Sequence, residues 1–222
     1  MSLKVHLLWD LDGTLINSEE EVLEALKKSV SDVGLSEEDQ CAPFRVGPTI
    51  DKILENSFSS IVLTLERKQK IIENFRKNYD NCGFYKTVSF GGLEEILLDK
   101  NYIHHIVTNK PDLATNRILD RLRWQNYFAD VVTPYTFMKN SVEVKKTKTE
   151  LFKYLINKYK GKRFIGIGDM ATDAVAALNN DIDAIGVLWG TGTQSELYNC
   201  NCSYIVKTVY ELKVLLKNLI NA

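Results

Sequence analysis

The segment Asp10-Leu11-Asp12-Gly13-Thr14 constrains this chain most, because it follows directly on the apolar run of residues 5–9. An apolar run of this length that ends at a glycine-containing turn predicts a buried strand of a parallel sheet. In open α/β sheets, ligands bind just beyond the carboxyl ends of the strands. The pattern therefore places the carboxylates of Asp10 and Asp12 where such folds carry out their chemistry.

Two carboxylates this close repel each other, and the repulsion would drive one of them to take up a proton. A divalent cation removes the repulsion and leaves a carboxylate able to attack phosphorus and form an aspartyl-phosphate. Asp10 is then the candidate nucleophile. Asp12 is the candidate general acid that protonates the leaving oxygen and later deprotonates water. The alternative is a solvated turn in which both acids are only structural.

The segment resembles the first signature of the haloacid dehalogenase superfamily, and specifically of its phosphatase branch. In that branch the first aspartate is the nucleophile, and the aspartate two residues later marks the members that transfer phosphoryl groups. The resemblance implies an Mg²⁺-dependent enzyme, and it requires three further motifs in a fixed order along the chain.

The second motif is a strand that ends in a hydroxyl residue. Residues 102–107 form a β-type run that ends at Thr108-Asn109-Lys110-Pro111. A hydroxyl and a neighbouring backbone amide at a strand end can bind phosphate oxygens. The resemblance assigns this role to Thr108 and Asn109, although the same four residues are also typical of a plain turn.

The third motif is a lysine ahead of a helix. Family members often carry Lys-Pro-x-Pro-(Asp/Glu)-x-Phe, and aligning Glu150-Leu151-Phe152 on this pattern puts the lysine at Lys146. Both prolines are threonines here, and two more lysines lie close by, so Lys145 and Lys148 remain alternatives. One buried ammonium is needed to offset the acids and the phosphate.

The fourth motif begins at Gly168-Asp169, after the strand-like residues 164–167, and ends at Asp173. Carboxylate, carbonyl and water oxygens suit Mg²⁺. The resemblance implies that Asp169 binds the metal directly, together with Asp10 and the backbone carbonyl of Asp12. Asp173 is expected to orient ligands or waters instead.

The long gap between Asp12 and Thr108 exceeds the roughly thirty residues of one βα unit. Its apolar residues keep helical spacing, so the sequence predicts a helical cap over residues 16–86, inserted into an α/β, Rossmann-like core of residues 1–15 and 87–222. The cap segment around Arg45 and the late segment Trp189-Gly190-Thr191-Gly192 resemble phosphoglycolate-phosphatase-like members. Arg45 is thereby a candidate for contacting the substrate.

Composition sets further bounds. The chain has 222 residues, 45% of them hydrophobic and 26% charged, which is ordinary globular usage. The net charge of −1 gives no reason to expect nucleic acid or an anionic membrane as a partner. The longest apolar runs are far shorter than a membrane span, so we expect a cytoplasmic protein.

These patterns together predict a hydrolase that removes phosphate from a small phosphorylated metabolite, such as a phosphoglycolate-like ester, a sugar phosphate or a nucleotide. A sugar phosphomutase of the same fold is an alternative, and so is a phosphonatase that uses Lys27, Lys28 or Lys52 in the cap. A receiver-like phospho-acceptor without turnover is the alternative from another class. The sequence does not choose among substrates.

Overall fold

The computed structural model describes residues 4–137 and 146–221. The chain divides into two compact units, of which one is the contiguous segment Ser18–Val88 and the other combines the segments before and after it. The sequence placed these boundaries after residues 15 and 86, two residues earlier in each case. Lys145 lies outside the described residues, so the structure gives no position for that alternative.

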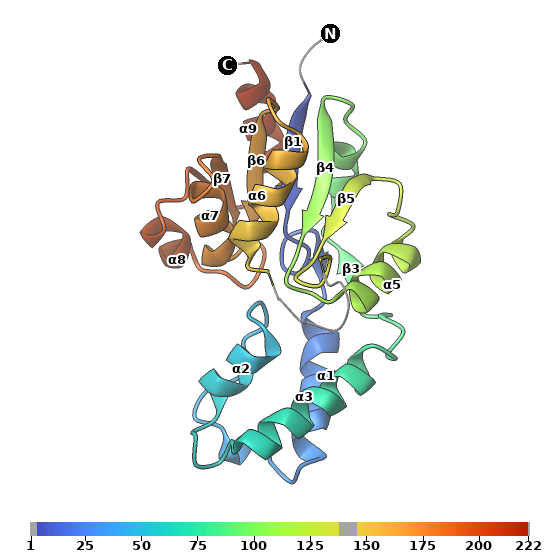
Figure 1. Ribbon diagram of the computed structural model, residues 1–222, viewed down its shortest axis with the longest axis vertical. Coiled ribbons are helices and arrows are strands. Elements are labelled where there is room, and N and C mark those ends of the chain that lie inside the picture. The colour runs from blue at the N-terminus through green and yellow to red at the C-terminus, as the bar shows by residue number, and fades with distance from the viewer. Residues whose placement is uncertain (1–3, 138–145, 222) are drawn as a thin grey trace. The chain divides into compact units, whose positions relative to one another are not determined.

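Figure 1 shows the elements of both units, in chain order from blue to red. The first unit contains β1 (Val5–Trp9), α4 (Leu93–Leu97), β4 (Tyr102–Val107), α5 (Asp112–Leu122), β5 (Phe128–Val132), α6 (Lys148–Lys158), β6 (Phe164–Gly168), α7 (Ala171–Leu178), β7 (Asp183–Val187), α8 (Gln194–Asn199), β8 (Tyr204–Val206) and α9 (Val209–Asn221). The short strands β2 (Ile16–Asn17) and β3 (Val88–Ser89), at the unit boundaries, pair with each other. Across the described parts of the chain, the helices are too short or too polar to span a bilayer.

Six strands form one sheet in the order β5-β4-β1-β6-β7-β8, and every pairing in it is parallel. The N-terminal strand β1 is central, with Leu7 in register with His104 of β4 on one side and with Ile165 of β6 on the other. A parallel sheet needs helical crossovers, and these supply the helices of the layered core. The predicted α/β, Rossmann-like fold is confirmed.

One face of the sheet is covered by α6 and α7. Leu8 and Val107 from the central strands pack there with Phe152 of α6 in a cluster of buried residues. A Cβ atom added to Gly166 of β6 would lie 2.8 Å from the Phe152 ring, so the absent side chain admits the helix. This close packing fixes the start of α6 near the carboxyl ends of the strands.

The second unit is helical, as the spacing of its apolar residues predicts. It consists of α1 (Glu19–Ser31), the 3-10 turn Glu37–Asp39, α2 (Ile50–Ser57) and α3 (Leu65–Tyr79). Helices α1 and α3 pack together, and their buried faces include Leu26, Ile71 and Phe75. This unit therefore has an apolar core of its own.

Candidate active site

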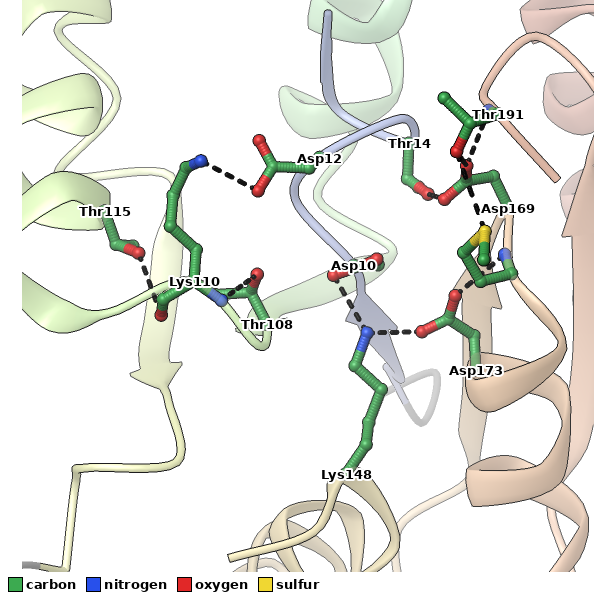
Figure 2. A network of polar contacts seen from close by, with 11 residues as sticks. Asp10, Asp12, Thr14, Thr108, Lys110, Thr115, Lys148, Asp169, Asp173 and Thr191 are labelled. Atoms are coloured by element: carbon green, nitrogen blue, oxygen red, sulfur yellow. Dashed lines mark hydrogen bonds and ion pairs between the residues drawn. The ribbon is translucent and has the colours of Figure 1, made fainter. Parts of the chain in front are cut away.

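Three neighbouring strands of the sheet end at the same edge and deliver the predicted polar residues together. Asp10 follows β1, Thr108 follows β4, and Asp169 follows β6. Because β4 and β6 flank β1 in the sheet, the three loops are adjacent (Figure 2). The sequence motifs, which are far apart along the chain, thus meet where parallel sheets bind ligands.

Asp10 is almost completely buried, with 8% of its surface exposed. Its Oδ1 lies 2.9 Å from Nζ of Lys148, and the same ammonium group donates a hydrogen bond to Oδ1 of Asp173. Burial raises the pKa of Asp10 to about 7, although the attraction of Lys148 opposes this rise. A buried carboxylate held beside one ammonium group is poorly solvated and well oriented, which are properties that nucleophilic attack requires.

The lysine at this position is Lys148, whereas the sequence alignment favoured Lys146. Nζ of Lys146 lies 3.0 Å from Oε1 of Glu150, and its side chain is 34% exposed. The difference follows from the start of α6, where Thr147 is the N-cap and forms a capping box with Glu150. Lys146 precedes the cap, while Lys148 occupies the first turn of the helix and points into the site. The capping box was a signal in the sequence that could have identified the lysine.

Asp169 is fully buried and held by hydrogen bonds from two loops. Its Oδ1 accepts from the Thr14 hydroxyl at 3.3 Å, and its Oδ2 accepts from the backbone N–H of Thr191 at 2.8 Å and of Gly192 at 3.3 Å. A Cβ atom on Gly192 would collide with the backbone carbonyl of Asp169. The glycine loop after β7 therefore supports this aspartate, a contact that the sequence motif did not reveal.

One carboxylate oxygen from each of Asp10, Asp169 and Asp173 lies within 4.8 Å of the others. Burial raises the pKa of Asp169 and of Asp173, because each carboxylate loses contact with water. Buried carboxylate oxygens that converge in this way fit a hard divalent cation, and Mg²⁺ prefers such ligands. The donor set therefore fits the magnesium ion that the resemblance implies.

The side chain of Asp12 lies apart from these three acids. Its Oδ2 is 2.9 Å from Nζ of Lys110, a residue to which the sequence analysis gave no role. Figure 2 shows the Asp10 carboxylate directed toward Lys148 and the Asp12 carboxylate directed toward Lys110. The two neighbouring acids thus each have an ammonium group beside them.

Thr108 is buried at the end of β4, and its Oγ1 accepts a hydrogen bond of 3.1 Å from the backbone N–H of Lys110. The hydroxyl hydrogen can still donate to another oxygen, as phosphate binding requires. Asn109, the next residue, is half-buried. Arg45 belongs to the other unit, where its side chain is exposed, so its contact with a substrate remains a prediction.

The parallel sheet and the acids at its strand ends define an α/β protein whose candidate site lies at the carboxyl edge of the sheet. Residues 7–187 match the family model of the haloacid dehalogenase-like hydrolases, and the chain belongs to that family. The predicted family is confirmed.

Several relatives of the chain are phosphatases. The chain is 29% identical to a phosphoglycolate phosphatase of Aquifex aeolicus over 83% of this chain and 84% of the relative. It is 25% identical to a phosphoglycolate phosphatase of Colwellia psychrerythraea over 96% and 97%, and 22% identical to a 5'-nucleotidase of Pseudomonas aeruginosa over 86% of each chain. The prediction of an enzyme of the phosphatase branch is thereby confirmed.

Solved structures of other proteins have a fold similar to that of this chain. The crystal structure of a predicted phosphatase from Clostridium acetobutylicum superimposes with a TM-score of 0.78 and 26% identity, covering 97% of this chain and 100% of the other. A hydrolase of the haloacid dehalogenase-like family from Streptococcus pneumoniae gives a TM-score of 0.79 at 20% identity, over 97% and 100%. The second likeness concerns the fold alone.

Proposed function

We propose that this protein is an Mg²⁺-dependent phosphomonoester hydrolase that works through an aspartyl-phosphate on Asp10. The observation that carries the proposal is the buried Asp10 carboxylate, 2.9 Å from the Lys148 ammonium, with Asp12 two residues further on. In this arrangement one acid is poised to attack and the other to transfer a proton, as covalent and general acid catalysis require.

In the first step the Asp10 carboxylate attacks phosphorus, the bond to the leaving oxygen breaks, and Asp12 gives that oxygen its proton. In the second step Asp12 accepts a proton from water and the water oxygen attacks phosphorus. The bond between phosphorus and the Asp10 oxygen breaks, which releases inorganic phosphate and restores the Asp10 carboxylate. Lys148, rather than Lys146, offsets the negative charge on the transferred group, and Thr108 with Asn109 orients its oxygens.

Asp10, Asp169 and the backbone carbonyl of Asp12 would hold Mg²⁺, which supplies positive charge to the phosphoryl oxygens when bound. Asp173 donates no proton in this scheme. It accepts hydrogen bonds from Lys148 and from the backbone N–H of Met170, the latter at 3.0 Å, and so fixes the lysine beside Asp10. We therefore keep Asp173 as an orienting residue, although its oxygen lies near the other two acids.

The substrate class is a small phosphate ester. The relatives named phosphoglycolate phosphatase and 5'-nucleotidase suggest which esters to try first. A panel containing 2-phosphoglycolate, sugar phosphates and nucleoside monophosphates, assayed with Mg²⁺ for release of inorganic phosphate, tests the proposal and ranks the substrates.

Turnover of p-nitrophenyl phosphate that needs Mg²⁺ and stops with chelator is the expected result. Acid quenching during turnover should also trap phosphate on the protein at Asp10. A stable phosphoprotein without turnover would favour a receiver-like acceptor, and transfer of phosphate to a second sugar phosphate would favour a phosphomutase. Phosphate release that persists in excess chelator would refute the metal dependence.

A further inference from the structure

Lys110 is a buried lysine in the loop after β4, and it has no role in the proposed mechanism. Only 8% of its surface is exposed. Lysines are rarely buried so completely, because removing an ammonium group from water is costly unless a negative group accompanies it. A lysine buried at the strand ends therefore needs a negatively charged group beside it, and its burial there needs an explanation.

The partner is Asp12, the candidate general acid. Nζ of Lys110 lies 2.9 Å from Oδ2 of Asp12, and 19% of the Asp12 side chain is exposed. A charge-assisted hydrogen bond of this length is stronger and more directional than one between neutral groups. This hydrogen bond restricts rotation of the Asp12 side chain about its Cα–Cβ and Cβ–Cγ bonds.

The backbone of Lys110 is itself fixed on both sides. Its N–H donates to Oγ1 of Thr108 at 3.1 Å, and its carbonyl accepts from Oγ1 of Thr115 at 3.5 Å. Thr108 directly follows β4 and Thr115 lies in α5, so the end of a strand and a helix both hold the lysine in place (Figure 2). An anchored lysine can impose an orientation on Asp12 rather than follow it.

The two lysines of the site separate the two neighbouring aspartates. Lys148, from α6, contacts Asp10 and Asp173, whereas Lys110, from the β4–α5 loop, contacts Asp12. The Asp12 carboxylate is thereby drawn away from Asp10 and toward the β4 side of the strand ends. A proton-transfer group is useful only if it reaches the leaving oxygen and leaves the nucleophile unobstructed.

We infer that Lys110 is a positioning residue that fixes the orientation of the Asp12 carboxylate for proton transfer to the leaving group. The inference rests on the proposed phosphatase mechanism. Lys110 acts through Asp12 and not on the phosphoryl group, so its effect depends on how much the leaving group needs a proton. Good leaving groups, such as p-nitrophenolate, depart without one, whereas alkoxides do not.

The test compares kcat/KM of Lys110→Met and of the unmodified enzyme on p-nitrophenyl phosphate, phenyl phosphate and an alkyl phosphate. The parameter kcat/KM reports steps up to the first irreversible one, so it isolates departure of the leaving group. We expect a loss of about 10- to 100-fold on the alkyl ester and of less than about threefold on the p-nitrophenyl ester. Lys110→Arg keeps the charge and should recover part of the alkyl activity.

Lys213→Met is the matched control, because Lys213 also pairs with an acid, Glu95, but on the surface of the same unit. It should leave all three rates unchanged. Equal losses on all three esters in Lys110→Met would overturn the inference, since the lysine would then act on the phosphoryl group. No loss on the alkyl ester would overturn it as well.

A crystal structure of Lys110→Met provides a readout that does not depend on activity. The Asp12 carboxylate should leave its original orientation, and an unmoved carboxylate would contradict the inference. Should the unmodified protein hydrolyse none of the esters, the proposed function fails, and this structural comparison still decides whether Lys110 orients Asp12.

Discussion

Two polar clusters lie along the same sheet, one at its carboxyl edge and one within it, and burial shifts the pKa values of their acids and imidazoles in opposite directions. The strand-end acidic cluster, made of Asp10, Asp169, Asp173 and Lys148, lies beyond the carboxyl ends of the strands. The histidine cluster is made of His6, His105 and Asp130, further back in the sheet, and of Tyr159 at the end of α6. Burial raises the pKa of the three aspartates in the first cluster and lowers the pKa of His6 and His105 in the second.

The histidine cluster is a chain of hydrogen bonds between strands. Nδ1 of His6 lies 2.8 Å from Nε2 of His105, and Nδ1 of His105 lies 3.0 Å from Oδ2 of Asp130. The Tyr159 hydroxyl donates to the same Asp130 oxygen at 2.8 Å. Burial lowers the pKa of His105 to about 4, with the nearby His6 adding to the effect.

Burial has a structural role in the histidine cluster, whereas at the strand ends it affects the residues that the proposed mechanism uses. Neutral imidazoles in the sheet satisfy one another and need no counter-ion, so they are compatible with an ordinary core. The acids at the strand ends are crowded and deprived of water, which raises the pKa of Asp10 to about 7. Shifts of this kind in clustered, buried acids are typical of functional sites.

The largest expected effect is the loss of turnover in Asp10→Asn. The amide keeps the shape of the side chain but cannot attack phosphorus, so phosphate release should fall by about a thousandfold or more. The control is the same substitution in the histidine cluster, Asp130→Asn, which should retain turnover. Residual activity of Asp10→Asn above roughly one per cent of the unmodified rate would remove Asp10 as the nucleophile.

Lys148→Met should reduce kcat/KM by about a hundredfold, and by a similar factor on every ester, because the lysine acts on the shared phosphoryl group. Lys146→Met is the natural comparison, since that lysine pairs with Glu150 on the surface. Its rates should change by less than about twofold, as is usual for an exposed pair. A larger loss in Lys146→Met than in Lys148→Met would reverse our choice of lysine.

The metal requirement should distinguish the two later aspartates. Asp169→Asn should raise the Mg²⁺ concentration for half-maximal activity by more than about a hundredfold, and Asp173→Asn by roughly ten- to a hundredfold. Titration of Mg²⁺ into chelator-treated protein measures both. If Asp173→Asn proved the more sensitive variant, Asp173 and not Asp169 would be the direct ligand.

Acidification should change the contributions of the two clusters to the stability of the metal-free protein in opposite directions. His105 has a pKa of about 4 when folded and about 6.5 when unfolded, so its stabilisation is full above pH 6.5 and is lost as the pH falls toward 4. The effect is on the order of 3 kcal/mol. The contribution of Asp10 to the free energy of unfolding depends on pH in the opposite direction. Its raised pKa lets the folded state bind a proton before the unfolded state does, as the pH falls below 7.

Melting temperatures in chelator at pH 7.5 and pH 5 measure this balance. Asp10→Asn lacks the compensating proton uptake and should lose more stability on acidification than the unmodified protein. His105→Gln should lose less. A pH dependence of Asp10→Asn no steeper than that of the unmodified protein would show that the acidic cluster does not offset the histidines.

The smallest expected effect belongs to the other unit. Arg45→Ala should lower kcat/KM by about tenfold for the best substrate and hardly at all for p-nitrophenyl phosphate, because only the former can use remote binding energy. Lys52→Ala, which removes another exposed cation of that unit, is the control. Equal losses on both substrates in Arg45→Ala would mean that this arginine does not determine specificity.

The sequence predicted the fold well because the central strands β1 and β6 are short apolar runs that end at polar turns. Asp10, Thr108 and Asp169 could be placed at one edge for the same reason, since each directly follows such a run. These positions depend on backbone topology, which the pattern of apolar residues controls.

Side-chain direction was harder to predict. Lys146 and Lys148 differ only in their position relative to the cap of α6, and the family pattern of prolines was absent as a guide. Lys110 occurs in a segment, Thr-Asn-Lys-Pro, that is typical of an ordinary turn. Its burial against Asp12 depends on how the loop after β4 meets the loop after β1, which no local pattern encodes.

The central place of β1 in the sheet has a consequence for synthesis of the protein. Leu7 emerges from the ribosome first, but its sheet neighbours His104 and Ile165 are made much later. The contiguous helical unit, Ser18–Val88, can complete its own packing during that interval. The strand that precedes the proposed nucleophile must therefore wait unpaired until β4 is made, and a nascent chain that stops before β4 would contain a finished helical unit and an apolar strand exposed to chaperones.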